Sequence, residues 1–123
     1  MQKIRLIFRL LNILLVVSFC LLLWTACDRE EMEVPEVETM DVTEIGRYGA
    51  KSGGIVSTEG GGNVSERGMI WAQSPDVSLE QFEGKMNAGA GAGVFYVDIS
   101  GLAPGTTYYI RAYATNEAGT GYG

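Results

Sequence analysis

The chain contains no histidine, the side chain that proteins use most often as a general base and as a transition-metal ligand. Basic residues are also scarce, with 9 Lys and Arg against 15 Asp and Glu and a net charge of −6. Nucleic-acid binding needs clustered Lys and Arg, so this charge balance argues against a nucleic-acid partner. A length of 123 residues allows one domain of ordinary size.

Cysteine is nearly absent as well, since Cys20 and Cys27 are the only two in the chain. Cleavage just before Cys27 would leave one thiol in the mature protein, which excludes an intramolecular disulfide. An exported domain of this kind would therefore depend on its hydrophobic core alone.

The N-terminal 26 residues have the pattern of an export signal. A basic segment is followed by an apolar run over residues 10–24 and then by two small residues, an order typical of a signal peptide. The apolar run has 15 residues, which is short of the roughly 20 that a membrane-spanning helix needs. We therefore expect residues 1–26 to be a cleaved signal peptide, and an uncleaved anchor is the second interpretation. The basic residues are Lys3, Arg5 and Arg9.

The sequence Thr25-Ala26-Cys27 resembles the lipobox of bacterial lipoproteins, in which the cysteine is diacylated and becomes the mature N-terminus. The resemblance covers only a few residues, and Trp24 stands where the family normally has leucine. It implies that Cys27 is lipidated and that the partner of this end of the chain is a membrane, because two acyl chains give stable anchoring. The alternative is cleavage by the ordinary signal peptidase, with Cys27 incidental.

An acidic segment follows Cys27. Residues 28–44 contain eight acidic residues and one basic residue, Arg29. We expect residues 27–36 to form a solvated, self-repelling tether. The segment also resembles the acidic run that directs Bacteroidetes-type lipoproteins to the outer leaflet. That resemblance implies an outer-membrane, surface-exposed protein, with a periplasm-facing position as the alternative.

From residue 37 onwards, short alternating apolar runs are separated by glycine clusters, which predicts an all-β sandwich over residues 37–123. The expected strands are 37–45, 50–57, 64–72 and 93–99, with a turn at residues 59–63. Val42 and Ile45 are expected to face the core. Residues 75–84 are expected to form one helical turn, with Ser78 as N-cap and Leu79 paired with Phe82.

Residues 102–116 resemble the corner and the following strand, strand F, of a fibronectin type III domain. The residues that carry the corner motif are Leu102, Pro104, Thr106 and Tyr108. The resemblance extends over about residues 35–123 and implies an immunoglobulin-like sandwich. It further implies that the Tyr108 hydroxyl bonds to upstream backbone. Inward-facing residues would be Ile110, Ala112 and Ala114, and outward-facing ones Tyr109, Arg111, Tyr113 and Thr115.

Residues 67–71 and 119–123 make the resemblance more specific, because together they are similar to modules near the N-termini of Bacteroides-like lipoproteins. The family's last strand, strand G, should begin where the sequence reaches Gly123. We therefore expect strand G to be missing or very short. Either the chain is a truncated gene product, or strand F is an open edge that a donor strand completes.

Recognition by this chain would depend on aromatic and basic side chains. Two alternating triplets on neighbouring strands would form one exposed stripe suited to stacking on sugars or on a protein. The alternative is that Trp71 points into the core, as the tryptophan of the third strand, strand C, does in this kind of fold, where strand C would correspond to residues 64–72. The six residues of the expected stripe are Arg67, Met69, Trp71, Tyr109, Arg111 and Tyr113.

No catalytic residue, metal site or cofactor is expected. Residues 89–93 are glycine-rich but precede a strand, so we interpret them as a flexible loop and not as a nucleotide site. Glu80, Glu83 and Asp98 lack a motif that would place a nucleophile beside them. The sequence predicts a lipid-anchored, non-catalytic spacer or adhesion module that binds protein or glycan. The alternative is the N-terminal module of a larger glycan-capturing or glycan-degrading surface lipoprotein.

Overall fold

The computed structural model describes residues 2–24 and 30–123, and the chain divides into two units, Met1–Glu30 and Glu31–Gly123. The first unit contains helix α1 (Gln2–Trp24), whose side chains from Lys3 to Ser18 are exposed. Within the described parts of the chain, no helix combines the length and the apolarity that a membrane crossing requires. Cys27, the predicted lipidation site, lies outside the described residues.

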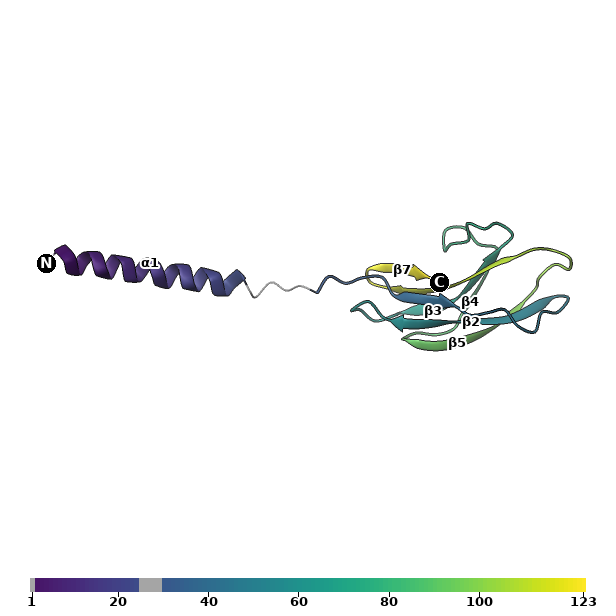
Figure 1. Ribbon diagram of the computed structural model, residues 1–123. Coiled ribbons are helices and arrows are strands. Elements are labelled where there is room, and N and C mark those ends of the chain that lie inside the picture. The colour runs from purple at the N-terminus through teal and green to yellow at the C-terminus, as the bar shows by residue number, and fades with distance from the viewer. Residues whose placement is uncertain (1, 25–29) are drawn as a thin grey trace. The chain divides into compact units, whose positions relative to one another are not determined.

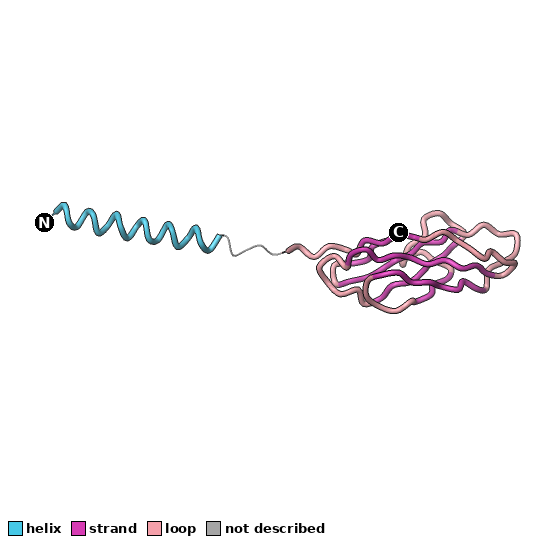
Figure 2. The backbone as a smooth tube through the Cα atoms, turned by 60° about the horizontal axis from the view of Figure 1, so that its bottom comes forward, coloured by secondary structure: helices cyan, strands magenta, loops and turns pink. Residues whose placement is uncertain are grey.

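Among its described residues, the second unit contains seven strands. They are arranged in two antiparallel sheets (Figure 1, Figure 2). One sheet has the order β1-β2-β5 and the other the order β4-β3-β6-β7. This arrangement confirms the predicted all-β, fibronectin type III or immunoglobulin-like sandwich. The bounds are β1 Glu36–Thr39, β2 Gly49–Thr58, β3 Glu66–Ala72, β4 Gly84–Asn87, β5 Gly93–Ser100, β6 Tyr109–Asn116 and β7 Gly119–Tyr122.

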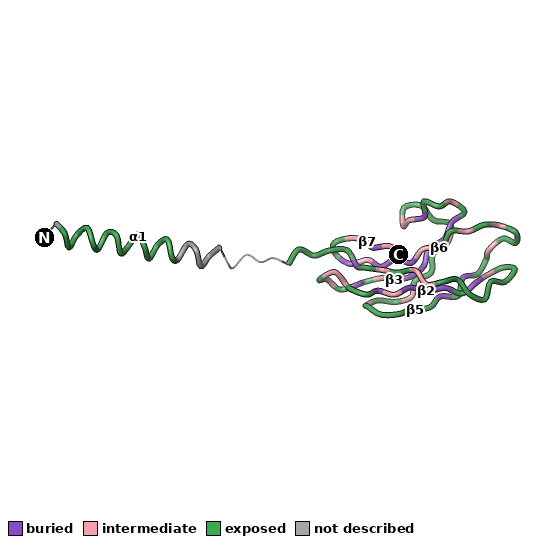
Figure 3. The backbone as a smooth tube through the Cα atoms, viewed as in Figure 1, coloured by how far each residue is buried: buried purple, intermediate pink, exposed green. Residues whose placement is uncertain are grey.

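The core lies between the two sheets and follows the alternation of the strands (Figure 3). In β5, Phe95, Val97 and Ile99 are buried, whereas Val94 and Tyr96 are exposed. Because successive side chains of a strand point to opposite faces, this pattern places one face of β5 on the core and the other in solvent. The inner faces of β2, β3 and β6 supply the rest of the core, including Val56, Met69, Trp71, Ala112 and Ala114.

The first strand is shorter than expected. It ends at Thr39, beyond which the Met40 N–H still donates to the carbonyl of Gly53 at 3.0 Å and Thr43 forms an isolated bridge with Lys51. The expectation that Val42 and Ile45 face the core is therefore wrong, since they are 36% and 78% exposed. The departure from regular pairing after Thr39 breaks the alternation on which the expectation depended.

Residues 75–84 do not form the expected helical turn. Instead, Ser78 and Gln81 exchange two backbone hydrogen bonds of 3.0 Å each, which closes a tight hairpin-like turn. The Ser78 hydroxyl accepts a hydrogen bond from the N–H of Glu80, so this side chain caps a turn and not a helix. Tertiary packing explains the difference, because the segment buries Val77 against a sheet. Strand β4, which follows the turn, is absent from the sequence prediction.

Strand G exists as β7, and it is short, as predicted. Its four residues pair with Tyr113 to Asn116 of β6, and the N–H of Gly123 donates to the carbonyl of Ala112 at 2.9 Å. The expectation of an open strand F is therefore wrong for the C-terminal part of β6, which β7 covers. Gly121 faces inward beside the backbone of Pro35.

The sandwich unit begins earlier than residue 37. The N–H of Glu33 donates to the carbonyl of Gly60 at 2.8 Å, and Pro35 is buried. The C-terminal part of the expected tether, residues 31–36, therefore belongs to the folded unit, with its acidic side chains exposed.

Candidate functional site

The two triplets of the expected stripe lie on opposite faces of their sheet. In the register between β3 and β6, Met69 pairs with Ala112 and Gly68 pairs with Tyr113. Residues directly opposite each other in a sheet point to the same face. Arg67, Met69 and Trp71 therefore face inward with Ala112, and Tyr109, Arg111 and Tyr113 face outward. The prediction of one continuous six-residue stripe is wrong.

The inner triplet belongs to the core. Met69 is fully buried and Trp71 is only 8% exposed, so the alternative placement of Trp71 as the core tryptophan is correct. The opposite strand accommodates the indole with a glycine, because a Cβ on Gly84 would lie 2.2 Å from the Trp71 ring. Arg67 reaches the rim of this core, where its guanidinium stacks over Phe95 at 5.4 Å.

Arg67 also holds the glycine-rich loop between β4 and β5. Its guanidinium donates to the carbonyls of Gly91 at 3.2 Å and Ala92 at 2.7 Å, with a longer contact of 3.4 Å to Ala88. The loop expected to be flexible is thus fixed by three contacts with one side chain. Each group of the loop that Arg67 contacts is a backbone carbonyl oxygen, and carbonyl oxygens do not attract phosphate.

Two of the three outer residues, Arg111 and Tyr113, are covered by the chain itself. Residues 73–83, which we call the covering segment, pack Val77 and Leu79 over Tyr113 on the outer face of β6. Tyr113 is fully buried, which corrects its expected exposure. Arg111 donates to the carbonyls of Gly123 at 3.0 Å and of Val77 at 3.3 Å. Only Tyr109, 43% exposed, retains a large free surface among the six residues.

A small charged network closes the outer face beside Tyr113. The Tyr113 hydroxyl donates to Glu66, which also forms an ion pair with Lys85. The Lys85 ammonium lies 5.3 Å from the centre of the Tyr113 ring. Hydrogen bonds from Lys85 and then from Tyr113 hold the pKa of Glu66 below its usual range. Burial has the largest effect on the pKa of Tyr113 and raises it above that of an ordinary tyrosine. The hydrogen bond to Glu66 and the charge of its carboxylate raise this pKa further.

The corner motif has the geometry that the resemblance implies. The Tyr108 hydroxyl accepts a hydrogen bond of 2.9 Å from the backbone N–H of Ala103. The Thr106 hydroxyl donates to the carbonyl of Pro104 at 3.2 Å, and Leu102 packs against the core. The motif therefore fixes how the chain crosses from β5 to β6, which is a structural role.

A groove of about 410 Å³ lies on the outer face of the β1-β2-β5 sheet, and we call it the Tyr96 groove. Tyr96 is 75% exposed and stands opposite Gly53, which has no side chain to cover it. Lys51 forms an ion pair with Glu44 at 3.0 Å and a longer one with Asp98 at 3.9 Å. The hydrogen bond and charge of Glu44 raise the pKa of Lys51. The residues that line the groove are Met40, Asp41, Thr43, Glu44, Lys51, Ser52, Tyr96, Val97 and Asp98.

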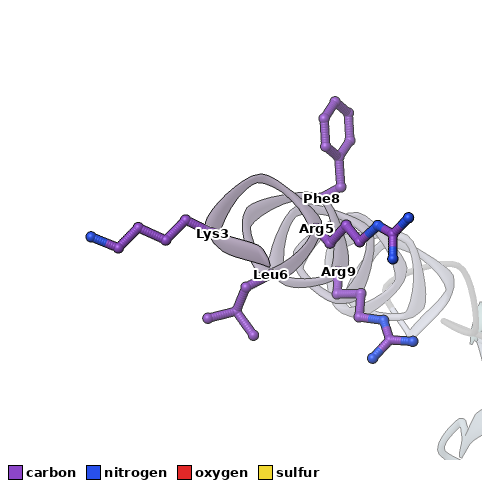
Figure 4. A pocket seen from close by; sticks show the side chains of 5 residues that line it. All are labelled: Lys3, Arg5, Leu6, Phe8 and Arg9. Carbon is purple, nitrogen blue, oxygen red and sulfur yellow. The ribbon is translucent and has the colours of Figure 1, made fainter. Parts of the chain in front are cut away.

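A second hollow lies in the helical unit. This hollow along α1 is lined by side chains that radiate away from one another, so it encloses no binding cavity (Figure 4). Within residues 2–24 and 30–123, no three Cys, Asp or Glu side chains are grouped closely enough to hold a metal ion. We take the Tyr96 groove as the candidate recognition surface. The signal for it in the sequence was the alternation of β5, which places Tyr96 and Asp98 on the face opposite the core.

No family model and no curated protein matches this chain. The structure is similar to a crystal structure of domains A168–A170 of titin, with a TM-score of 0.45 and 16% sequence identity. The match covers 72% of this chain and 27% of the titin chain, so the chain spans about a quarter of that fragment.

Proposed function

We propose that this chain is a lipid-anchored lipoprotein of the bacterial cell envelope, held in the membrane by acyl chains on Cys27. Its fibronectin type III-like sandwich acts as a non-catalytic spacer or binding module for a protein or a glycan. Domains of this architecture are common on cell surfaces, and their function resides in exposed surfaces and loops. The Tyr96 groove is such a surface, since it combines an exposed aromatic ring with charged groups.

The observation that best supports a role close to the membrane surface is where the folded unit begins. The sandwich unit starts at Glu31, only four positions after Cys27. Four residues span at most about 14 Å when fully extended. A lipid on Cys27 would therefore hold the sandwich close to the membrane surface, as a base for further modules or as a short-range adhesive unit.

Labelling with a palmitate analogue in a Bacteroidetes host tests the anchor. The wild type should incorporate the label and fractionate with the outer membrane, whereas Cys27→Ala should lose the label. Cys20→Ala is the matched control, because it removes the chain's other cysteine and should leave labelling intact. Equal labelling of the wild type and Cys27→Ala would overturn the lipid anchor.

Protease treatment of intact cells tests the surface location. The acidic residues after Cys27 would be replaced by amides, as Asp28→Asn, Glu30→Gln and Glu31→Gln. If the acidic run directs the protein to the outer leaflet, the wild type should be digested on intact cells and the triple variant should be protected. Protection of both proteins would favour the periplasm-facing alternative.

A further inference from the structure

Strand β5 is an unusual edge strand. Among the described residues, the sheet order leaves four strands at edges, and β1, β4 and β7 have four residues each, whereas β5 has eight. All eight residues of β5 pair with β2 in continuous register, without a bulge. No described strand pairs with the other side of β5. Its outward backbone N–H and C=O groups therefore form a long, regular, unpaired row.

Apart from the single charge of Asp98, the devices that protect other edges are missing from β5. Soluble proteins protect edge strands by keeping them short, by bulges, or by lysine and proline. The strand β1 has a register shift at Glu36/Val37, and β4 contains Lys85. The sequence of β5, GVFYVDIS, contains neither lysine nor proline and is rich in residues that favour strands. A template for strand pairing thus remains open on this side of the sandwich.

Apolar groups are partly exposed along the same side. Strand β1 packs across from β6 and β7, and β5 packs across from β3, so the edges β5 and β4 lie on the same side of the sandwich. Met86 of β4 faces the inner layer opposite Met69, yet it is 39% exposed. On the outer face of β5, Val94 is 50% exposed and Tyr96 is 75% exposed. An added strand would cover apolar surface on both of its faces.

Charge indicates what kind of strand fits. Between Glu31 and Gly123 there are five basic and thirteen acidic side chains, a formal charge of −8. A second copy of the chain would therefore be repelled, whereas a cationic segment would be attracted. The only charge of β5 itself is Asp98, whose side chain is 82% exposed and lies 3.9 Å from the Lys51 ammonium, which pairs more closely with Glu44 at 3.0 Å. On the inner side of the strand, the Arg67 guanidinium lies over the Phe95 ring, so the attraction of a cationic segment depends on its outward face.

From these observations we infer that the free edge of β5 binds an extended segment of another protein by β-strand addition, and that this segment alternates apolar and basic residues. Its backbone pairs with the unpaired groups of β5. Its apolar residues point inward beside Val97, next to the partly exposed Met86, because Arg67 already covers Phe95. Its basic residues point outward, where they reach the Asp98 carboxylate and the face of the Tyr96 ring.

The inference rests on the binding role in the proposed function and not on the lipid anchor. Loss of palmitate labelling at Cys27 would leave the β5 site intact. A failure of peptide binding would in turn leave an anchored spacer.

The test uses the full chain in detergent micelles and a fluorescein-labelled, amidated peptide of sequence KVTVKVTVK. Hydrogen exchange should slow about tenfold for those amides of residues 93–100 that point away from β2 when the peptide is added, with little change in β4 and β7. Anisotropy should show that Asp98→Lys and Tyr96→Ser each weaken binding about fivefold. Both side chains are exposed, so both variants should remain folded. Asp98→Asn is the milder charge change, because Asp98→Lys places a second ammonium group directly opposite Lys51.

Matched controls separate the site from general attraction. Asp76→Lys changes the net charge as much as Asp98→Lys but lies in the covering segment, and Tyr109→Ser removes an exposed tyrosine from the other sheet. Both should bind the peptide within twofold of the wild type. A proline-interrupted peptide, KVTPKPTVK, should not bind, because proline cannot donate to a strand partner.

Four outcomes would overturn the inference. The peptide could fail to protect residues 93–100, or it could protect a different strand. An acidic analogue, EVTVEVTVE, could bind as tightly as the basic peptide. Finally, the chain alone could dimerise in sedimentation experiments with residues 93–100 protected, which would make a second copy the occupant of the edge.

Discussion

The side-chain amide of Asn116 donates a hydrogen bond of 2.7 Å to the backbone carbonyl of Glu33, which lies 83 positions earlier in the chain. The same nitrogen donates to the carbonyl of Glu59 at 2.7 Å. The amide oxygen accepts from the N–H groups of Ala118 at 2.8 Å and Gly119 at 3.2 Å. One buried side chain thus joins the start of the sandwich to the β2–β3 and β6–β7 turns.

Replacing Asn116 with alanine should lower the free energy of unfolding by about 2 to 4 kcal/mol, because two carbonyls and two N–H groups lose a buried partner. Urea unfolding measures the change, and limited proteolysis should detect release of residues 31–35. The control is Asn63→Ala in the exposed β2–β3 turn, which should stay within about 0.5 kcal/mol of the wild type. Equal stability of the two variants would show that the Asn116 contacts contribute little.

The corner tyrosine gives a second prediction. Tyr108→Phe removes the acceptor for the Ala103 N–H and keeps the ring, so it should cost about 1 kcal/mol of stability. The adjacent Tyr109→Phe is the control, because Tyr109 is exposed, and its effect should be below about 0.5 kcal/mol. Thermal unfolding of the three proteins measures both effects. A Tyr108→Phe variant as stable as Tyr109→Phe would rule out a stabilising corner bond.

The approach of Gly121 to the N-terminal segment leaves no room for a side chain. An added Cβ would lie 1.8 Å from the carbonyl oxygen of Pro35, so Gly121→Ala must push residues 33–36 away from β7. We expect a loss of about 3 kcal/mol, typical of severe overpacking. Gly46→Ala is the control, since its Cβ would make only ordinary contact at 3.5 Å. Similar unfolding midpoints for both variants would contradict the close packing of Pro35 on β7.

Acid should weaken the network beside Tyr113. The pKa of Glu66 is lower in the folded protein than in the unfolded chain, where it is about 4.3. The stabilisation by ionised Glu66 is therefore present above about pH 4.3 and is lost as the pH falls through the lower folded pKa.

Urea unfolding at pH 7, 5 and 3 measures this effect. The stability difference between the wild type and Glu66→Gln should be constant from pH 7 to 5 and should shrink at pH 3. Lys85→Met removes the hydrogen bond that lowers the pKa of Glu66 most. This variant should therefore lose less stability between pH 5 and pH 3 than the wild type does. Parallel pH profiles for all three proteins would mean that Glu66 does not contribute in this way.

Local patterns were sufficient where a structure depends on neighbours in sequence. The alternation of Phe95, Val97 and Ile99 predicted a half-buried strand, and the structure confirms it. Consecutive glycines predicted the β2–β3 turn, where Gly60 and Gly61 have positive φ angles of 72° and 84°. The prediction of a continuous six-residue stripe was wrong, because neither the register of β3 with β6 nor the burial of Tyr113 follows from one strand alone.

The sequence by itself determined that residues 37–123 form a β-sandwich with a tyrosine corner, since alternation and corner residues act over short distances. The tertiary structure alone decided which faces are free. A one-residue change in register moves every side chain of a strand to the other face, and Met69 pairs with Ala112 and not with Tyr113. Tyr113 alternates outward as predicted, yet it is buried because residues 73–83 fold over it. Such coverage depends on contacts between segments far apart in the chain, which no local pattern encodes.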